Sequence, residues 1–95
     1  MKRQLERACF LCGKNGCADP LDKHHIFGGS NRKKSEKYGL YVYLCHHECH
    51  ENGRNAVHRN PETAQKLHEY GQLLAMEENN WTADEFRLEF GRNYL

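Results

Sequence analysis

Histidines and cysteines are concentrated in one stretch of this chain, where they could bind metal ions. Five of the seven histidines fall within 27 positions that also contain two of the cysteines. They are His24, His25, His46, His47 and His50, accompanied by Cys45 and Cys49. Imidazole and thiolate are the ligands that zinc and related divalent ions prefer. Scattered surface histidines would not cluster in this way, so the sequence predicts metal chemistry.

The adjacent residues His24 and His25 could have two different roles. Both residues lie at the end of a short segment with the composition of a strand. Adjacent residues of a strand point to opposite faces. One histidine could therefore hold a metal ion while the other addresses a water molecule, and histidine is the side chain that most readily exchanges a proton near neutral pH. Such an arrangement suits a hydrolase.

Four cysteines form two closely spaced pairs, Cys9-x2-Cys12 and Cys45-x3-Cys49. Four thiolates are the closed tetrahedral set of a structural zinc site. Gly13 follows the first pair and permits the positive φ of a tight zinc knuckle, as does Gly16. The fifth cysteine, Cys17, has no evident partner, although it could replace Cys12 if the knuckle folds differently. His46 and His47 also compete as ligands, but thiolates bind zinc more strongly.

The elements that must position these residues can be traced along the chain. Residues 21–27 are expected to form the first strand. Residues 40–44 are β-branched, aromatic and apolar, which predicts a second strand that pairs antiparallel with the first. Residues 28–31 break the first strand, and the basic run 32–37 is expected to be a loop or short turn. The second strand should deliver Cys45 into the start of a helix that carries Cys49 and His50. Residues 1–8 are expected to form a short helical turn.

Two further helices are predicted towards the C-terminus. Asn60 and Pro61 are typical of a helix start, and this helix should continue to about residue 76 or 78. Thr82 and Glu85 have the spacing of a capping box at the start of the last helix, which Gly91 should end. The expected buried residues are Ala64, Leu67, Tyr70 and Leu74, with Leu73 as a further candidate, and Phe86 with Phe90 on the last helix. The chain should form one domain, residues 1–95, with a core at 9–60 and helices at 61–95.

Charge and composition narrow the class of protein. Residues 1–60 carry a net charge of +5 and residues 61–95 a net charge of −4. A basic segment that also holds the histidines favours a polyanionic substrate. The odd number of cysteines and the absence of an N-terminal apolar run favour reduced thiols in a cytoplasm over a secreted disulfide scaffold. No stretch has the composition of a membrane span.

The arrangement resembles the HNH endonucleases of the phage and prophage type. The matching residues are the doublet His24-His25 and the element Cys45-x3-Cys49-His50. Further similarity lies in segments 23–29 (KHHIFGG), 32–40 (RKKSEKYGL), 56–60 (AVHRN) and 90–95 (FGRNYL). The resemblance implies an α+β protein with a zinc-stapled, treble-clef-like ββα-metal core and two additional C-terminal helices.

The resemblance also implies roles for single residues. His25 would be the general base, and His24, His50 and His58 would hold the catalytic ion, with a phosphate contact as the alternative role of His58. The ion would be Mg2+ or Mn2+, with Ni2+ or Zn2+ as other candidates. Zn2+ bound by the four paired cysteines would be structural. The middle asparagine of the family has no counterpart, since Leu40 stands at its place, and Asn31 or a backbone group could substitute. Apart from the resemblance, the basic residues that flank the histidines in sequence are expected to contact DNA phosphates; they are Arg32, Lys33, Lys34 and Lys37.

The sequence therefore predicts a metal-dependent DNA endonuclease or nickase in the cytoplasm of a bacterial or phage-infected cell. It would act on DNA as a monomer or weak dimer and would not associate with a membrane. A zinc module that binds DNA or protein without cutting is one alternative. A subunit that cuts only together with phage packaging proteins is another.

Overall fold

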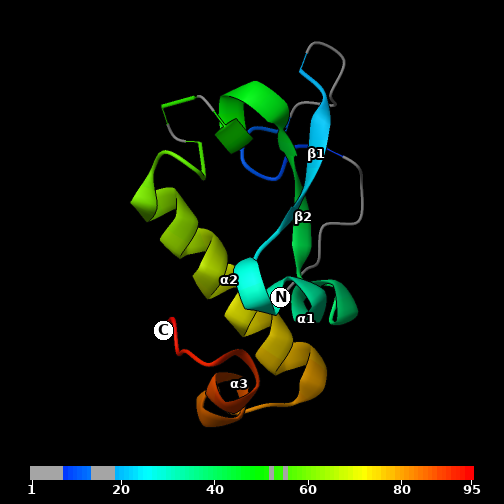
Figure 1. Ribbon diagram of the computed structural model, residues 1–95, viewed down its shortest axis with the longest axis vertical. Coiled ribbons are helices and arrows are strands. Elements are labelled where there is room, and N and C mark those ends of the chain that lie inside the picture. The colour runs from blue at the N-terminus through cyan, green and yellow to red at the C-terminus, as the bar shows by residue number, and fades with distance from the viewer. Residues whose placement is uncertain (1–7, 14–18, 52, 55) are drawn as a thin grey trace. The chain divides into compact units, whose positions relative to one another are not determined.

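The computed structural model describes residues 8–13, 19–51, 53–54 and 56–95. It is a small α+β protein whose two strands form an antiparallel sheet (Figure 1). The elements are β1 (Leu21–His25), η1 (Gly29–Asn31), α1 (Arg32–Lys37), β2 (Tyr41–Cys45), η2 (His46–Glu51), α2 (Pro61–Asn79) and α3 (Ala83–Phe90).

The chain divides into two compact units. The cysteine unit contains the described residues between 8 and 24 together with Val42–Ala64, and the helical unit contains His25–Tyr41 and Gln65–Leu95. β1, β2 and α2 each contribute residues to both units. The organisation as one domain stays a prediction.

The sheet follows the hairpin expected from the sequence, with slightly different ends. In the cysteine unit the backbone N–H of His46 donates to the carbonyl of Pro20 at 2.7 Å, and in the helical unit Ile26 donates to Leu40 at 3.0 Å. β1 ends at His25, two residues earlier than predicted, and β2 extends to Cys45. β2 therefore ends at Cys45, one of the predicted zinc ligands, and η2 begins with His46.

Phe27 lies at the centre of the core of the helical unit. Its side chain is 1% exposed, and its ring centroid is 5.0 Å from that of Phe90 and 5.5 Å from that of Phe86. Gly71 of α2 packs against the same segment. A Cβ atom at Gly71 would lie 2.7 Å from Cγ2 of Ile26 and 2.9 Å from Cε2 of Phe27. The missing side chain thus allows the backbone of α2 to approach a tightly packed core.

The helix starts predicted from capping residues are confirmed. The Asn60 side-chain oxygen accepts hydrogen bonds from the backbone N–H groups of Glu62 and Thr63 at the start of α2, at 2.9 and 3.2 Å. At α3, the hydroxyl of Thr82 accepts from the backbone N–H of Glu85, whose carboxylate accepts from the backbone N–H of Thr82. These bonds satisfy N–H groups that have no partner within their helix.

The buried face of α2 differs in part from the prediction. Leu67 and Leu74 are buried as expected, whereas Ala64 and Tyr70 are only partly buried and Leu73 is 43% exposed.

Gln72 is buried instead of Leu73. Its side-chain amide donates to the side-chain oxygen of Asn93 at 2.7 Å, and its side-chain oxygen accepts from the backbone N–H of Tyr94 at 2.7 Å. A buried amide is tolerated when its polar atoms are paired. The C-terminal segment is thereby joined to α2.

The prediction of a loop at residues 32–37 was wrong, because this segment is the helix α1. Arginine, lysine and glutamate have good helix propensity, and the run contains no glycine or proline. Ser35 is fully buried; its hydroxyl donates to the carbonyl of Leu40 and accepts from the backbone N–H of Phe27. This tertiary anchor supports a helix of six residues that could not be stable alone.

We expect the stability of the helical unit to depend on the protonation of His68. Its ring stacks on Phe27, with centroids 5.6 Å apart, and packs beside Tyr94. Burial, reinforced by the charge of Arg92 and partly opposed by a hydrogen bond with the backbone of Ile26, lowers the pKa of His68. A proton therefore binds the unfolded chain more readily, so the contribution of His68 is complete above about pH 6.5 and is lost as pH falls below that value.

Urea unfolding of the wild-type protein and of His68→Gln across this pH range measures the effect. The wild-type protein should lose stability more steeply than His68→Gln as pH falls. His47→Gln is the matched control because His47 is exposed and belongs to the cysteine unit. Equal pH dependence in wild type and His68→Gln would contradict the prediction.

Candidate metal sites

Four cysteine sulfur atoms converge in the cysteine unit, where they could bind a zinc ion. The sulfur atoms of Cys9, Cys12, Cys45 and Cys49 all lie within 4.8 Å of one another, and those of Cys12 and Cys45 are 3.4 Å apart. With zinc to sulfur bonds of about 2.3 Å, tetrahedral ligands lie about 3.8 Å apart. The group thus has the composition and spacing of a closed structural site and is compatible with zinc.

Backbone hydrogen bonds shape the turn that carries the first cysteine pair. The backbone N–H of Cys12 donates to the sulfur of Cys9 at 3.4 Å, and that of Gly13 donates to the carbonyl of Cys9 at 2.8 Å. Gly13 has the predicted positive φ, 80°. Phe10 donates to the carbonyl of Tyr43 at 2.8 Å, which fixes the turn to β2. Cys17 and Gly16 lie outside the described residues, so the alternative role of Cys17 as a ligand stays a hypothesis.

The protonation of the thiols also fits a cation site. Burial raises the pKa of Cys9, but hydrogen bonds, led by that from the backbone of Cys12, lower it to about 6. Burial and the neighbouring thiols raise the pKa of Cys45 to about 12 and also raise the pKa of Cys49. Closely spaced thiolates repel one another, so the thiols of Cys45 and Cys49 stay protonated at neutral pH. A zinc ion binding here would displace those protons.

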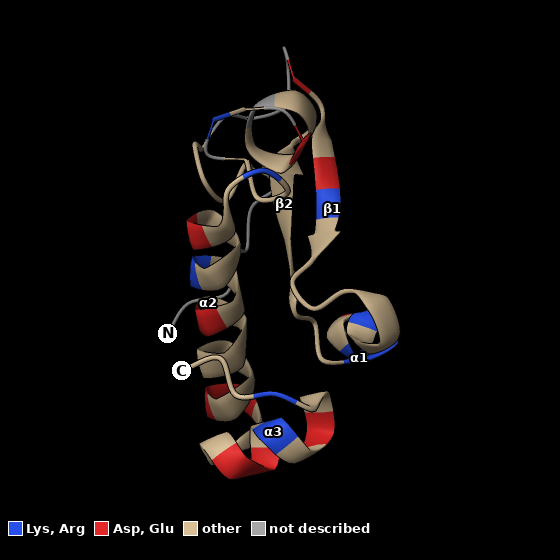
Figure 2. Ribbon diagram, turned by 60° about the vertical axis from the view of Figure 1, so that its left-hand side comes forward, with Lys and Arg blue, Asp and Glu red and all other residues tan. Residues whose placement is uncertain are grey.

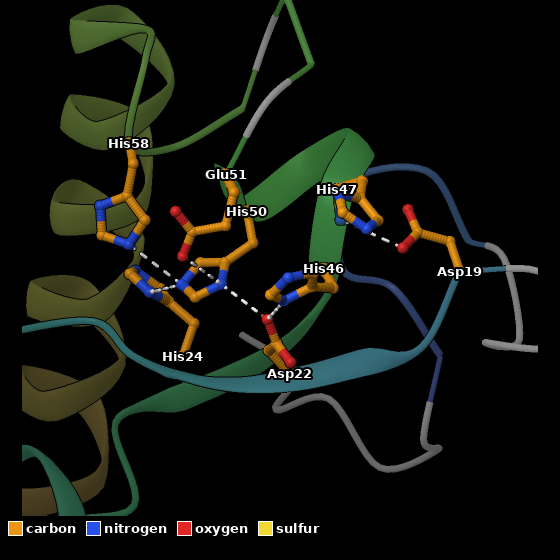
Figure 3. A network of polar contacts seen from close by, with 8 residues as sticks. All are labelled: Asp19, Asp22, His24, His46, His47, His50, Glu51 and His58. Atoms are coloured by element: carbon orange, nitrogen blue, oxygen red, sulfur yellow. Dashed lines mark hydrogen bonds and ion pairs between the residues drawn. The ribbon is translucent and has the colours of Figure 1, made fainter.

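Three histidine rings form a second group in the same unit. Nε2 of His50 lies 3.3 Å from Nδ1 of His24 and 3.0 Å from Nε2 of His58. Figure 3 shows the rings of His24 and His58 directed towards this one nitrogen of His50. Ligand atoms about 2.05 Å from a tetrahedral metal ion lie about 3.3 Å apart, so these nitrogens have suitable spacing for a shared ion.

Three separate elements position the histidine group. His24 comes from β1 and His50 from η2, whereas His58 follows the break after η2. Backbone hydrogen bonds hold this last segment against η2: Val57 donates to the carbonyl of Cys49 at 2.8 Å, and His58 donates to that of His50 at 3.2 Å. The sequence did not indicate where His58 would lie, and these bonds explain its place.

Asp22 was missed by the sequence analysis, which considered its partner His46 only as a competing zinc ligand. Oδ2 of Asp22 lies 2.6 Å from Nδ1 of His46 and 2.9 Å from Nδ1 of His50. Burial raises the pKa of Asp22, but the hydrogen bonds from both histidines outweigh it and lower the pKa. The hydrogen bond between Asp22 and His46 raises the pKa of His46. Asp22 and His24 are two residues apart and share one face of a strand, and His46 and His50 are four residues apart. These spacings were the features of the sequence that could have indicated the contact of Asp22 with both histidines.

His25 belongs to the helical unit. Its side chain is 13% exposed, and its Nε2 lies 3.5 Å from a carboxylate oxygen of Glu36. The ring packs edge to face against Tyr41, with centroids 6.2 Å apart. A carboxylate facing Nε2 favours a proton on that nitrogen, which leaves the lone pair on Nδ1.

The basic residues expected to contact DNA lie on α1, where Figure 2 colours Lys and Arg blue. Arg32, Lys33 and Lys37 are exposed. Lys34 is partly buried and donates to the backbone carbonyl of Glu89 at 2.5 Å, so it also holds α3. Asn31 donates to the carbonyl of Phe90 at 2.9 Å.

No family model, curated protein or solved structure matches this chain. Within the part of the chain that the structure describes, no helix has the length and apolar character needed to cross a membrane.

Proposed function

We propose that this protein is a metal-dependent DNA endonuclease or nickase of the HNH type, with a treble-clef-like core stapled by zinc. The observation that carries the proposal is the convergence of His24, His50 and His58 on one point in the unit that also contains the four clustered cysteines. Three neutral imidazoles leave positions of a divalent ion open to substrate oxygens, which distinguishes such a group from the closed cysteine site.

Each histidine has one role in this proposal. His24, His50 and His58 bind the ion, which supplies positive charge to the phosphate and to the leaving oxygen. His25 follows His24 in β1, and consecutive residues of a strand project to opposite faces. In this proposal His25 is the general base, the group that would take a proton from the attacking water.

The remaining charged and thiol groups support this chemistry. The exposed Arg32, Lys33 and Lys37 of α1 offer positive charge to the phosphates of DNA. The four cysteines hold a structural zinc ion and thereby fix Cys49, the residue directly before the metal ligand His50.

We expect His25→Ala to abolish most cleavage while leaving the fold intact. General base catalysis contributes about 10²- to 10⁴-fold to a rate, so cleavage should fall by that order. The measurement is conversion of supercoiled plasmid to open-circular and linear forms with Mg2+, Mn2+, Ni2+ or Zn2+, and with EDTA. Zinc content and circular dichroism establish that the variant is folded.

His47→Ala is the matched control because His47 is exposed and lies outside the histidine group. It should cleave like the wild-type protein. Undiminished cleavage by His25→Ala would exclude His25 as the base. No cleavage by a folded, zinc-loaded wild-type protein with any of these ions would instead favour a binding module or a subunit that requires a partner.

A further inference from the structure

The carboxylate of Asp22 lies on the opposite side of the His50 ring from His24 and His58 (Figure 3). Nδ1 of His50 is 2.9 Å from Oδ2 of Asp22, whereas Nε2 of the same ring faces the other two histidines. The two nitrogens of one ring therefore have different neighbours, and this difference decides which nitrogen carries the proton.

A neutral imidazole has one N–H group and one lone pair, and an ionised carboxylate can only accept hydrogen bonds. Nδ1 of His50 must therefore carry the proton and donate it to Asp22, which at 2.9 Å is nearer to this nitrogen than the Glu51 carboxylate at 3.4 Å. The lone pair is then on Nε2, directed towards His24 and His58. Histidines that bind metal ions commonly donate their second ring N–H to a carboxylate, which fixes the tautomer and the orientation of the ring.

The distances favour this hydrogen-bonding role over a metal site made of Asp22, His46 and His50. Oδ2 of Asp22 is only 2.6 Å from Nδ1 of His46 and 2.9 Å from Nδ1 of His50. Two ligands of one tetrahedral ion lie about 3.3 Å apart, and 2.6 to 2.9 Å is the range of charge-assisted hydrogen bonds. The carboxylate is thus held by two N–H donors.

The backbone places Asp22 firmly beside η2. His46 donates its backbone N–H to the carbonyl of Pro20 at 2.7 Å, so the start of η2 is joined to the residue directly before β1. Its side chain then donates to Asp22. The carboxylate cannot turn away from His50 without losing the bond from His46.

We propose that Asp22 is the positioning residue of the His24, His50 and His58 group, and that it sets the affinity of this group for divalent transition-metal ions. Asp22 acts through the ring of His50, which it locks with the lone pair on Nε2. The inference rests on the metal-binding part of the proposed function and is independent of DNA cleavage.

The test compares Asp22→Asn with the wild-type protein, both loaded with zinc at the cysteines. The amide keeps the shape of the side chain but removes its charge and can donate to Nδ1 of His50. Loss of such a partner typically weakens metal binding by about 10- to 100-fold, so calorimetric titration with Ni2+ should show that loss. Asp19→Asn is the matched control, because the Asp19 carboxylate accepts from the backbone of His47 and lies outside the group; its Ni2+ affinity should equal that of wild type.

A second measurement needs no variant. Long-range proton to nitrogen-15 correlation spectra of the zinc-loaded wild-type protein, recorded without nickel, should assign the proton of His50 to Nδ1. A proton on Nε2 would overturn the inference even if Asp22→Asn failed to fold. Wild-type nickel affinity in a folded Asp22→Asn would also overturn it.

These outcomes are separable from those of the proposed function. Nickel binding that weakens in Asp22→Asn, in a wild-type protein that cleaves no DNA, would support the role of Asp22 and refute a nuclease that acts without a partner. Cleavage by the wild-type protein together with unchanged nickel affinity in Asp22→Asn would support the nuclease and refute the role of Asp22. A wild-type protein that does not bind nickel would overturn both the metal group and the role of Asp22.

Discussion

Cys49→Ser should lose the zinc ion and with it the ordered structure of the cysteine unit. Cys49 is buried, and its sulfur belongs to a group that joins the turn at residues 9–12, the end of β2 and η2. A unit of this size has a small apolar core and depends on a staple. Structural zinc sites contribute on the order of 10 kcal/mol, which exceeds the total stability of many small domains.

Two measurements check this expectation. Zinc released to a chromophoric chelator gives the stoichiometry, and amide spectra with and without EDTA report the order of the cysteine unit. Cys17→Ser is the matched control and should retain zinc. Zinc retained by Cys12→Ser and lost by Cys17→Ser would show that the ligand set is wrong at one position. A cysteine unit that stays ordered in EDTA would show that zinc is not its staple.

Phe27→Ala should destabilise the helical unit by about 3 to 5 kcal/mol, the usual cost of removing a buried phenylalanine ring. The ring of Phe27 is 1% exposed and is surrounded by four aromatic rings, so its removal leaves a cavity that rigid neighbours cannot fill. Those neighbours are His68, Phe86, Phe90 and Tyr94. Such a loss is a large fraction of the 5 to 15 kcal/mol typical of a folded domain.

Urea unfolding followed by circular dichroism measures the change. Leu88→Ala on α3 provides the comparison, because Leu88 is 76% exposed and its truncation should change the free energy of unfolding by less than about 0.5 kcal/mol. If Phe27→Ala behaved like Leu88→Ala, the packing described for Phe27 would be refuted. Zinc content of Phe27→Ala should equal that of wild type, since Phe27 lies in the other unit from the cysteines.

Features that depend on neighbours in sequence could be predicted. The helix starts at Asn60 and Thr82 rest on hydrogen bonds that span only a few residues, so the residue types alone were sufficient. The same holds for Gly13, whose positive φ belongs to a local turn. The two strands were found from their composition, although their ends shifted by one or two residues.

Features that depend on partners distant in sequence could not be predicted. α1 is anchored by the burial of Ser35 against Leu40 and Phe27. The basic run itself contains no feature that predicts this contact. Gln72 is buried only because Asn93 and Tyr94 pair with it. Asp22 was overlooked for a similar reason, since its contact with His50 requires the register of β1 against η2.

The shared ring of His50 limits how many metal ions the cysteine unit can hold. His50 belongs both to the group with His24 and His58 and to the group with Asp22 and His46. A neutral ring has a single lone pair, so an ion bound by one group denies this ligand to the other. Occupation of both groups would require an imidazolate, with both ring nitrogens deprotonated. As long as the His50 ring is neutral, an ion held by His24, His50 and His58 therefore excludes a second ion at Asp22, His46 and His50, which agrees with the hydrogen-bonding role of Asp22.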